Sequence, residues 1–511
     1  MGADTAVSRG ALASLDTRRL LVAVLFVAIF AMVASRGQPA DTDTWWHLKS
    51  GQLMWDTGKV LLTDPFSHTA AGQSWIDHGW LVQVMLWPIY RATGLAGLAL
   101  LLAAIVTAAF ALVYRQCEGR PFVAAFAALL AAIASSVIWA VRPQIVSFLL
   151  AAIIAYLLDA YRRTGNVRRL WPIPVVMVLW ANCHAGFVVA LILMGCYLAG
   201  ALLDQITSPR ETPPKARPAA LALFLLVSLP AVLLNPNTVR MIPYAYQTIS
   251  IGPLQAFIQE WAAPDFHNLQ FHPFIWLLLL TLAAMGLSRR RADWVDLILL
   301  CVFGYMGLLA VRNVALFALV AAPILARYAT AALDELALSP RLSWLGMITH
   351  TLPLPRPRRS IVALNTTLLA VVLAVAGVMV GLNLIRLQDS TVWGKGLPLQ
   401  SVEYLRQHDL PGQMFNSYNW GGYLIWALYP DKPVFVDGRT DLYAFNGVLD
   451  DYVQVQLAGP GWQEILDRYN VGYVVTEQGG LLTSALDGSG NWQKVYSDTL
   501  AVIHVRTGVT P

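Results

Sequence analysis

Long apolar segments separated by short polar ones fill roughly the first three quarters of this chain. Most of these apolar segments are close to the ~20 residues that a helix needs to cross the hydrocarbon core of a bilayer. The pattern therefore predicts an α-helical polytopic membrane protein of about eleven spans. The predicted spans are 19–35, 94–114, 121–139, 143–160, 170–182, 186–204, 218–235, 272–287, 293–310, 313–329 and 361–385.

The overall composition supports a membrane protein. Hydrophobic residues make up 57% of the chain and charged residues only 13%, whereas soluble proteins have about 25% charged residues. The first apolar segment follows Arg18 and Arg19, and no small-residue cleavage site comes after it. We therefore expect a retained signal anchor instead of a cleaved signal peptide.

Basic residues are concentrated in every second loop, which the positive-inside rule assigns to the cytoplasm. This alternation predicts a cytoplasmic N-terminus (1–18), a transmembrane domain (19–385) in the plasma (inner) membrane and an extracytoplasmic domain (386–511). The predicted inner loops contain Arg18/Arg19, Arg115/Arg120, Arg162/Arg163/Arg168/Arg169, Arg210/Lys215/Arg217, Arg289/Arg290/Arg291 and Arg356/Arg358/Arg359.

The long outer loop 36–93 contains two tryptophan-rich stretches, Asp43–Trp55 and Trp75–Tyr90. Both are predicted to be amphipathic helices that lie along the membrane interface. The long apolar stretch Trp171–Leu203 is interrupted by the polar sequence Asn182-Cys-His-Ala-Gly186. We expect two short helices that meet at this polar elbow.

The C-terminal region changes character, because short β-branched runs alternate with helical patterns. From Arg386 onwards there are 8 basic and 13 acidic residues, whereas the rest of the chain has 27 and 17. The basic excess therefore follows the membrane loops and does not indicate nucleic-acid binding. Alternating strands and helices predict a small α/β domain. The predicted strands are 413–418, 433–437, 473–476, 493–496 and 501–505, and the predicted helices are 401–408, 422–428 and 462–469.

Polar residues recur at the predicted outer ends of the spans, while the spans themselves are nearly bare of charge. If the helices form one bundle, these side chains line one outward-facing cavity, where a membrane enzyme would meet a lipid-linked substrate. The candidates are Asp41, Asp43, His47, Asp64, Asp77, His78, Arg142, Asn182, His184, Asn235, Asn237, Glu260, Arg312 and Asn313.

These residue types suit glycosyl transfer from a polyprenyl phosphate sugar. Asp43, with Asp41 second, is the candidate general base for the acceptor hydroxyl. Arg142 and Arg312 can hold phosphate through forked hydrogen bonds. Asp41 and Asp43 can also hold a divalent cation such as Mg²⁺ or Mn²⁺, provided that the backbone turns so that both carboxylates meet one ion.

The outer-loop sequences Asp41-Thr-Asp-Thr-Trp-Trp-His47, Asp64-Pro-Phe-Ser67 and Trp75-Ile-Asp-His78 resemble the first outer loop of GT-C membrane glycosyltransferases. Arg142-Pro-Gln144 and Arg312-Asn313 extend this resemblance, and the blocks Asn416–Leu424 and Val436–Tyr443 recur in such proteins. Protein O-mannosyltransferases and the lipid A aminoarabinose transferase belong to the same superfamily. The resemblance implies a GT-C-like membrane domain, a catalytic carboxylate after the first span and a polyprenyl-linked sugar donor.

Structural explanations remain open for most of these residues. Asp41 and Asp43 could cap a helix that begins near Trp45, and Asp64 could stabilise a turn. Arg142 and Arg312 could anchor helix ends at lipid head groups. The histidines His47, His78 and His184 could be structural. The stretch Asp437-Gly-Arg-Thr-Asp441 is interpreted as a strand-end turn held by an Asp–Arg pair.

The sequence thus predicts transfer of a sugar from a polyprenyl-phosphate-linked donor to an extracytoplasmic acceptor. Asp43 and Asp41 are the expected catalytic residues, and the expected partners are the lipid-linked donor, membrane lipids and a glycan, lipid or protein acceptor. The substrate-binding candidates are Arg142, Arg312, His47, His78, His184 and Glu260. The alternative is a non-catalytic translocator or assembly subunit for lipid-linked glycans.

Overall fold

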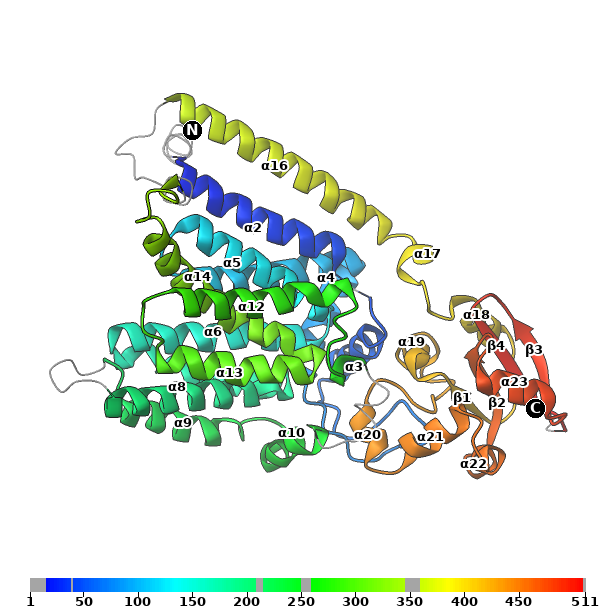
Figure 1. Ribbon diagram of the computed structural model, residues 1–511. Helices are drawn as coiled ribbons and strands as arrows, with labels where there is room; N and C mark the ends of the chain where they lie inside the picture. Colours follow the sequence, from blue (N-terminus) through cyan, green and yellow to red (C-terminus); the bar gives the residue numbers. More distant parts are fainter. Residues whose placement is uncertain (1–14, 38–39, 208–214, 250–258, 345–358, 509–511) are drawn as a thin grey trace, which may run out of the picture.

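A computed structural model describes residues 15–37, 40–207, 215–249, 259–344 and 359–508. Helices side by side form one bundle, and a small sheet lies beyond one end of it (Figure 1). Arg210 of one predicted basic loop, and Arg356 and Arg358 of another, lie outside the described residues. So does part of the long predicted loop 236–271.

Every predicted span is a helix in the structure. Among the described residues, eight helices are long and apolar enough to cross a membrane, whereas α9 and α13 are shorter and α7 has 12 residues. The number of membrane crossings therefore stays a prediction. The helices are α2 Thr17–Arg36, α4 Trp80–Gln116, α5 Pro121–Ala134, α6 Pro143–Thr164, α7 Pro172–Cys183, α8 Val188–Thr207, α9 Pro218–Ala231, α12 His272–Leu287, α13 Trp294–Leu309, α14 Val314–Leu336 and α16 Arg359–Arg386.

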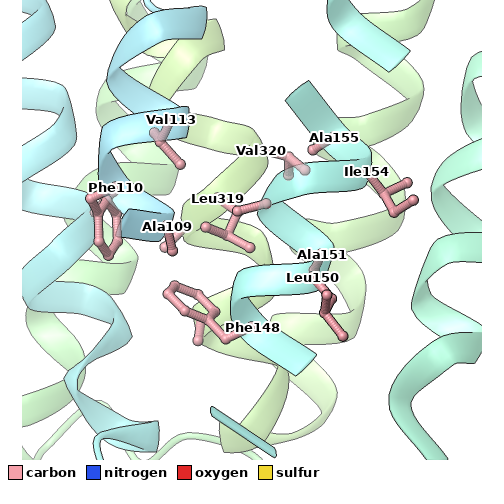
Figure 2. Close-up of a cluster of buried hydrophobic side chains, with 14 of the residues drawn as sticks. Ala109, Phe110, Val113, Phe148, Leu150, Ala151, Ile154, Ala155, Leu319 and Val320 are labelled. Atoms are coloured by element: carbon pink, nitrogen blue, oxygen red, sulfur yellow. The ribbon is translucent and has the colours of Figure 1, made fainter. Parts of the chain in front are cut away.

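The bundle core forms where α4, α6 and α14 meet, and α14 is buried along most of its length. Small alanines on these helices allow close approach of the backbones, and phenylalanine and leucine side chains fill the remaining space. Figure 2 shows this packing for Ala109, Phe110, Val113, Phe148, Leu150, Ala151, Ile154, Ala155, Leu319 and Val320.

Helix α16 lies on the outside of the bundle along α2 (Figure 1). Two asparagine side chains of α16 donate to backbone carbonyls at opposite ends of α2: Asn365 to Leu15 at 3.0 Å and Asn383 to Ala34 at 2.8 Å. The two helices therefore run in the same direction. This is the arrangement expected for the first and last spans of a protein that crosses the membrane an odd number of times.

The predicted breaks near residues 91–93 and 182–186 are present. Helix α4 bends at Gly94, whose φ of +62° is a conformation that glycine adopts without steric cost. Helix α7 ends at Cys183, and the short helix η3 (Ala185–Phe187) begins after His184.

The first predicted loop helix is α3, Thr44–Thr57. Trp45 and Trp46 of this helix are buried within the protein, whereas Trp55 is exposed. The Trp45 ring contacts those of Tyr423 and Trp426 on α19 (Tyr418–Leu428). The second predicted helix, Trp75–Tyr90, is irregular up to Gly79, and only its part from Trp80, where α4 begins, is helical. The first tryptophans of α3 thus pack against the C-terminal region of the chain.

The C-terminal region forms a four-stranded sheet in the order β1-β2-β4-β3, in which β1 pairs with β2 in parallel and the other pairs are antiparallel. Four of the five predicted strands are present: β1 Gln413–Asn416, β2 Val471–Glu477, β3 Trp492–Ser497 and β4 Ala501–Arg506. The helices here are α17 Ser390–Trp393, α18 Leu399–Gln407, α19, α20 Thr440–Ala444, α21 Val448–Gln456, α22 Trp462–Arg468 and α23 Leu481–Gly488.

The predicted strand 433–437 is wrong, although its residues are buried. Val434 forms a single bridge with Ser67 of the first loop, and the backbone N–H of Phe435 donates to the side chain of Asn416 at 2.8 Å. These partners come from a loop and a side chain, so no ladder forms, and an apolar alternating pattern reports burial as well as strand pairing.

The first loop and the C-terminal region share one hydrophobic core. Trp46, Phe66 and Trp75 of the loop pack in the same cluster as Phe415 and Val436. A second, larger cluster fills the bundle. The first loop is therefore the element that joins the helical bundle to the sheet. The remaining described helices are α10 Met241–Ile249, η1 Ser135–Ile138, η2 Val167–Arg169, η4 Thr238–Arg240, η5 Gln259–Trp261, η6 Leu269–Phe271 and η7 Val311–Asn313.

Candidate active site

Asp41 caps helix α3. Its Oδ1 atom accepts from the backbone N–H of Thr44 at 2.9 Å, from the Thr44 hydroxyl at 2.7 Å and from the backbone N–H of Asp43 at 3.2 Å. Its other oxygen, Oδ2, pairs with Arg142, which directly precedes α6. The capping role considered for both carboxylates thus belongs to Asp41.

Asp43 occupies the N-cap position of α3 but makes no capping hydrogen bond. Its Oδ1 atom accepts from the indole N–H of Trp46 at 3.1 Å, and its Oδ2 atom lies 3.1 Å from Arg142. Burial raises the pKa of Asp43 to about 6, opposed by the positive charge of Arg142. A carboxylate with this pKa is ionised near pH 7 and still basic enough to accept a proton.

Arg142 is held by three carboxylates, because Glu260 of η5 lies 3.3 Å from it in addition to Asp41 and Asp43. Burial alone would lower the pKa of Arg142, but the three negative charges outweigh burial and raise it. We call Asp41, Asp43, Arg142 and Glu260 the carboxylate–arginine cluster. It joins the first loop, the start of α6 and η5.

Arg312 lies beside this cluster in a different electrostatic situation. Its guanidinium carbon is 4.1 Å from the centre of the Trp261 ring, next to Glu260 in sequence. A backbone hydrogen bond from Val311 to Ala262 at 3.0 Å holds the two segments together. Within the described part of the chain, no carboxylate lies within 4 Å of Arg312, so its charge is available to an incoming anion.

His78 and His184 stand next to each other, with ring centres 5.0 Å apart. The Tyr244 hydroxyl donates to Asp441 at 3.0 Å, so the His78 Nδ1 atom, 2.9 Å from it, donates to the Tyr244 oxygen. The His184 Nδ1 atom accepts from the backbone N–H of Gly186 at 2.9 Å. Burial lowers the pKa of His78 to about 4 and also holds the pKa of His184 well below its usual value, so both rings are neutral.

His47 belongs to a separate buried network. The Gln83 amide contacts the His47 Nδ1 atom at 3.1 Å and donates to Asp77 at 2.8 Å. Burial lowers the pKa of His47 and raises that of Asp77 to about 7. The His47 ring also stacks on Trp46, whose indole contacts Asp43. His47 is therefore linked to Asp43 through Trp46.

The C-terminal region also contacts Asp43, through Gly438. A Cβ atom placed on Gly438 would lie 1.8 Å from the Asp43 Oδ1 atom, so any larger residue there would displace the Asp43 carboxylate. The predicted Asp–Arg turn is present beside it, because Arg439 contacts Asp437 at 2.6 Å. Arg439 also contacts Asp64 of the first loop at 2.5 Å, so this buried turn fastens the C-terminal region onto the loop.

Asp64 and Asn182 have structural partners. The Asp64 carboxylate accepts from the backbone N–H groups of Phe66 and Ser67, at 3.0 and 3.1 Å, as well as from Arg439. The Asn182 amide donates to two backbone carbonyls, both at 2.8 Å, and accepts from the indole N–H of Trp80. Both residues satisfy local backbone or join elements, as the turn and elbow hypotheses expected.

The cation site predicted at Asp41 and Asp43 stays a prediction that this arrangement does not favour. Three of their four carboxylate oxygens face Arg142 or Trp46, and the fourth is the capping atom of α3. The guanidinium thus stands where a cation would bind. Among the described residues, no group of three or more His, Cys, Asp and Glu side chains could hold a metal ion.

The structure brings the eight predicted site residues to one end of the bundle. Asp41, Asp43, Arg142 and Glu260 are in direct contact, Arg312 lies beside them, and His78 and His184 form an adjacent pair. Sequence reasoning missed Tyr244 and Asp441, and it missed that Gly438 packs against the Asp43 carboxylate. The Asp437–Asp441 block was visible as a motif, whereas no sequence signal pointed to Tyr244.

Comparisons with known proteins give a similarity of fold. No family model and no curated protein matches the chain. The archaeal oligosaccharyltransferase AglB from Archaeoglobus fulgidus, in complex with an inhibitory peptide and a dolichol-phosphate, has a TM-score of 0.53 at 12% identity; the match covers 90% of this chain and 69% of that one. Another structure of the A. fulgidus enzyme, tethered with an acceptor peptide, has a TM-score of 0.52 at 13% identity, with the same coverage.

ArnT from Cupriavidus metallidurans in the apo state has a TM-score of 0.50 at 17% identity, and the match covers 94% of this chain and 97% of that one. The similarity therefore extends over the helical bundle and the C-terminal region together. It agrees with the motifs of the first loop, which predicted the same architecture. This chain therefore shares its fold with the archaeal oligosaccharyltransferase and with ArnT.

Proposed function

We propose that this protein transfers a sugar from a polyprenyl-phosphate-linked donor to an extracytoplasmic acceptor, with Asp43 as the general base. The observation that carries the proposal is the pairing of two groups at one site. Asp43 is a partly buried carboxylate with a pKa of about 6, and Arg312 is a guanidinium without a carboxylate partner among the described residues. Base and phosphate ligand are the two functions that this reaction requires.

The proposed reaction proceeds as a displacement at the anomeric carbon. The acceptor oxygen forms a bond to that carbon, and its proton moves to the Asp43 carboxylate. The bond from the anomeric carbon to the phosphate oxygen breaks, and polyprenyl phosphate leaves with the bonding electron pair. Arg312 stabilises the charge that develops on the phosphate. A positioned base typically contributes ~10²–10⁴-fold to the rate.

The other residues position these two. Arg142 is already bound by three carboxylates, so its proposed role is to hold Asp43 at the wall of the site, while Asp41 fixes the start of α3. The neutral rings of His78 and His184 line the neighbouring wall. No step requires a metal ion.

The fold comparison supports the donor class. The archaeal oligosaccharyltransferase with a similar fold has been solved with a dolichol-phosphate, which is a polyprenyl-type lipid phosphate. We propose the same class of lipid for this chain. We also propose that the site faces the extracytoplasmic side, as the alternating charges of the loops predict, with residues 1–18 in the cytoplasm.

The test is sugar transfer by the purified full-length protein in lipid nanodiscs, with a panel of radiolabelled polyprenyl phosphate and diphosphate sugars. Asp43→Asn should lower turnover or donor hydrolysis more than ~100-fold, because the amide cannot accept the proton. Asp56→Asn is the matched control, since Asp56 is an exposed carboxylate of the same helix.

Each outcome has a definite meaning. Near-wild-type turnover of Asp43→Asn would remove Asp43 from the mechanism. A folded wild-type protein that consumes none of the donors would favour the alternative function, a translocator or assembly subunit for lipid-linked glycans. Donor binding without consumption, measured with the same radiolabelled lipids, would identify that alternative directly.

A further inference from the structure

A cavity of about 360 Å³ lies between the first loop, α10 and α20, where the described chain brings these three elements together (Figure 1). Its volume falls in the range of ~300–1,000 Å³ found for small-molecule sites. The side chains that matter for its chemistry are Gln73, Arg240, Gln247, Asp441, Phe445 and Asn446. None of them belongs to the carboxylate–arginine cluster.

Hydrogen bonds connect the elements that line this cavity. The Arg240 guanidinium donates to the Ser74 hydroxyl at 2.8 Å, and the Asn446 amide donates to the Gln73 side chain at 2.9 Å. The first contact joins η4, which directly precedes α10, to the first loop. The second contact joins the first loop to the C-terminal region. The cavity is therefore already formed before a ligand binds, which lowers the cost of binding.

The cavity shares a wall with the candidate active site. The Tyr244 hydroxyl, which lines the cavity, contacts both Asp441 and His78. Asp441 is three residues from Gly438, the residue that packs against the Asp43 carboxylate. Three residues span at most ~11 Å of chain. The Asp441 side of the cavity therefore lies close to Asp43.

The lining favours a neutral sugar over other ligands. The Gln73 and Asn446 amides pair with each other, and their remaining N–H groups and carbonyl lone pairs can meet hydroxyl groups in either direction. Phe445 is 56% exposed and presents an aromatic surface suited to the apolar face of a sugar ring. One basic and one acidic residue, Arg240 and Asp441, give no net charge that would select an anion or a cation.

We propose that this cavity binds a neutral sugar residue of the acceptor, so that the acceptor of the transferase is a glycan. This inference rests on the proposed function, because it assigns the acceptor class to the same site. The bound sugar orients a neighbouring hydroxyl of the glycan toward Asp43. That hydroxyl then forms the new glycosidic bond, its proton passes to Asp43 and the lipid phosphate departs.

The test measures acceptor binding without turnover. Full-length protein in nanodiscs, without any donor, is titrated with neutral gluco-, galacto- and manno-configured trisaccharides, and binding is followed by saturation-transfer NMR. The same titration is done with a uronic acid trisaccharide and with a serine- and threonine-containing peptide. Phe445→Ala should weaken binding of the neutral trisaccharide at least ~10-fold, because the aromatic surface is lost.

The matched control is Leu481→Ala. Leu481 is a similarly exposed apolar residue, 63% exposed, in the same region of the chain, and it does not line the cavity. Its substitution should leave trisaccharide affinity within ~2-fold of wild type. Thermal unfolding of all variants, followed in the same nanodiscs, shows that each is folded.

Three results would overturn the inference: no neutral trisaccharide binds, Phe445→Ala binds as well as wild type, or only the peptide or the uronic acid compound binds. The failure of the proposed function looks different. If Asp43→Asn kept full transfer activity, the base assignment would fall, while trisaccharide binding that depends on Phe445 would remain. Absence of trisaccharide binding together with a large loss in Asp43→Asn would remove only the cavity assignment.

Discussion

Two groups of charged residues lie at opposite ends of helix α6, and their arrangements differ. At the N-terminal end stands the carboxylate–arginine cluster with Arg312 beside it. At the C-terminal end, Arg162 contacts Asp159 at 3.1 Å, Asp293 at 3.2 Å and Asp296 at 2.9 Å. Arg327 of α14 pairs with Asp296 as well. The second group thus joins α6, α13 and α14 through ion pairs.

Each guanidinium of the second group has a carboxylate partner, and its members are largely buried. Buried charges that pair with one another hold the helices in place, and they leave no charge free to bind a ligand. At the other end, Arg312 has no carboxylate partner among the described residues, and Asp43 has a raised pKa. The comparison teaches that charge left without a partner, and not charge alone, is what singles out a candidate functional site.

The strongest test of this comparison is Arg312→Gln. We expect transfer to fall ~10²–10³-fold, because the developing phosphate charge loses its partner. Binding of radiolabelled polyprenyl phosphate should weaken in parallel. Arg36→Gln, an exposed arginine at the end of α2, is the control and should stay within ~2-fold of wild type. Unchanged donor binding in Arg312→Gln would mean that Arg312 only anchors its helix.

Arg327→Gln tests the other end of the bundle. Removing one partner of a buried ion pair typically costs ~3–5 kcal/mol, so the free energy of unfolding should fall and the thermal midpoint in nanodiscs should drop. Turnover per folded molecule should remain within ~2-fold of wild type, since the catalytic groups are at the opposite end of α6. A large loss of turnover without a loss of stability would contradict the structural role of this group.

The pH dependence sharpens the assignment of Asp43. A general base must be ionised, and ionisation is lost as the pH falls through its pKa. Because burial raises the pKa of Asp43 to about 6, kcat/KM should fall ~10-fold per pH unit below about pH 6, well above the ~3.9 of an ordinary aspartate. His78 stays neutral over this range. A rate that stays constant down to pH 5 would exclude Asp43 as the base.

The smallest expected effect is that of metal removal. EDTA should change turnover less than ~2-fold, because Arg142, Thr44 and Trp46 already occupy the oxygens that a hard cation would need. Turnover lost on chelation and restored by Mn²⁺ or Mg²⁺ would show that a cation replaces Arg142 in the working enzyme.

Much of the architecture was predictable, because its signals are local. Hydrophobic runs located all eleven helices, the polar elbow Asn182–Gly186 located the break between α7 and α8, and charge alternation predicted which loops share a side. The segment 433–437 was not predictable as a non-strand, because its alternation reflects burial against Ser67 and Asn416. Similarly, the pattern of α3 did not reveal that α19 covers Trp45.

The sequence by itself determined the membrane character of the chain, the helical elements and the residue types that gather at the ends of the spans. These follow from hydrophobicity, propensity and charge, which act over neighbouring residues. The tertiary structure alone decided that Asp41 caps α3 while Asp43, the proposed base, makes no capping hydrogen bond. It also decided that Gly438 closes on Asp43, and that Arg142 is occupied by carboxylates while Arg312 is not. Such roles depend on contacts between residues a hundred or more positions apart, and on the burial that those contacts create.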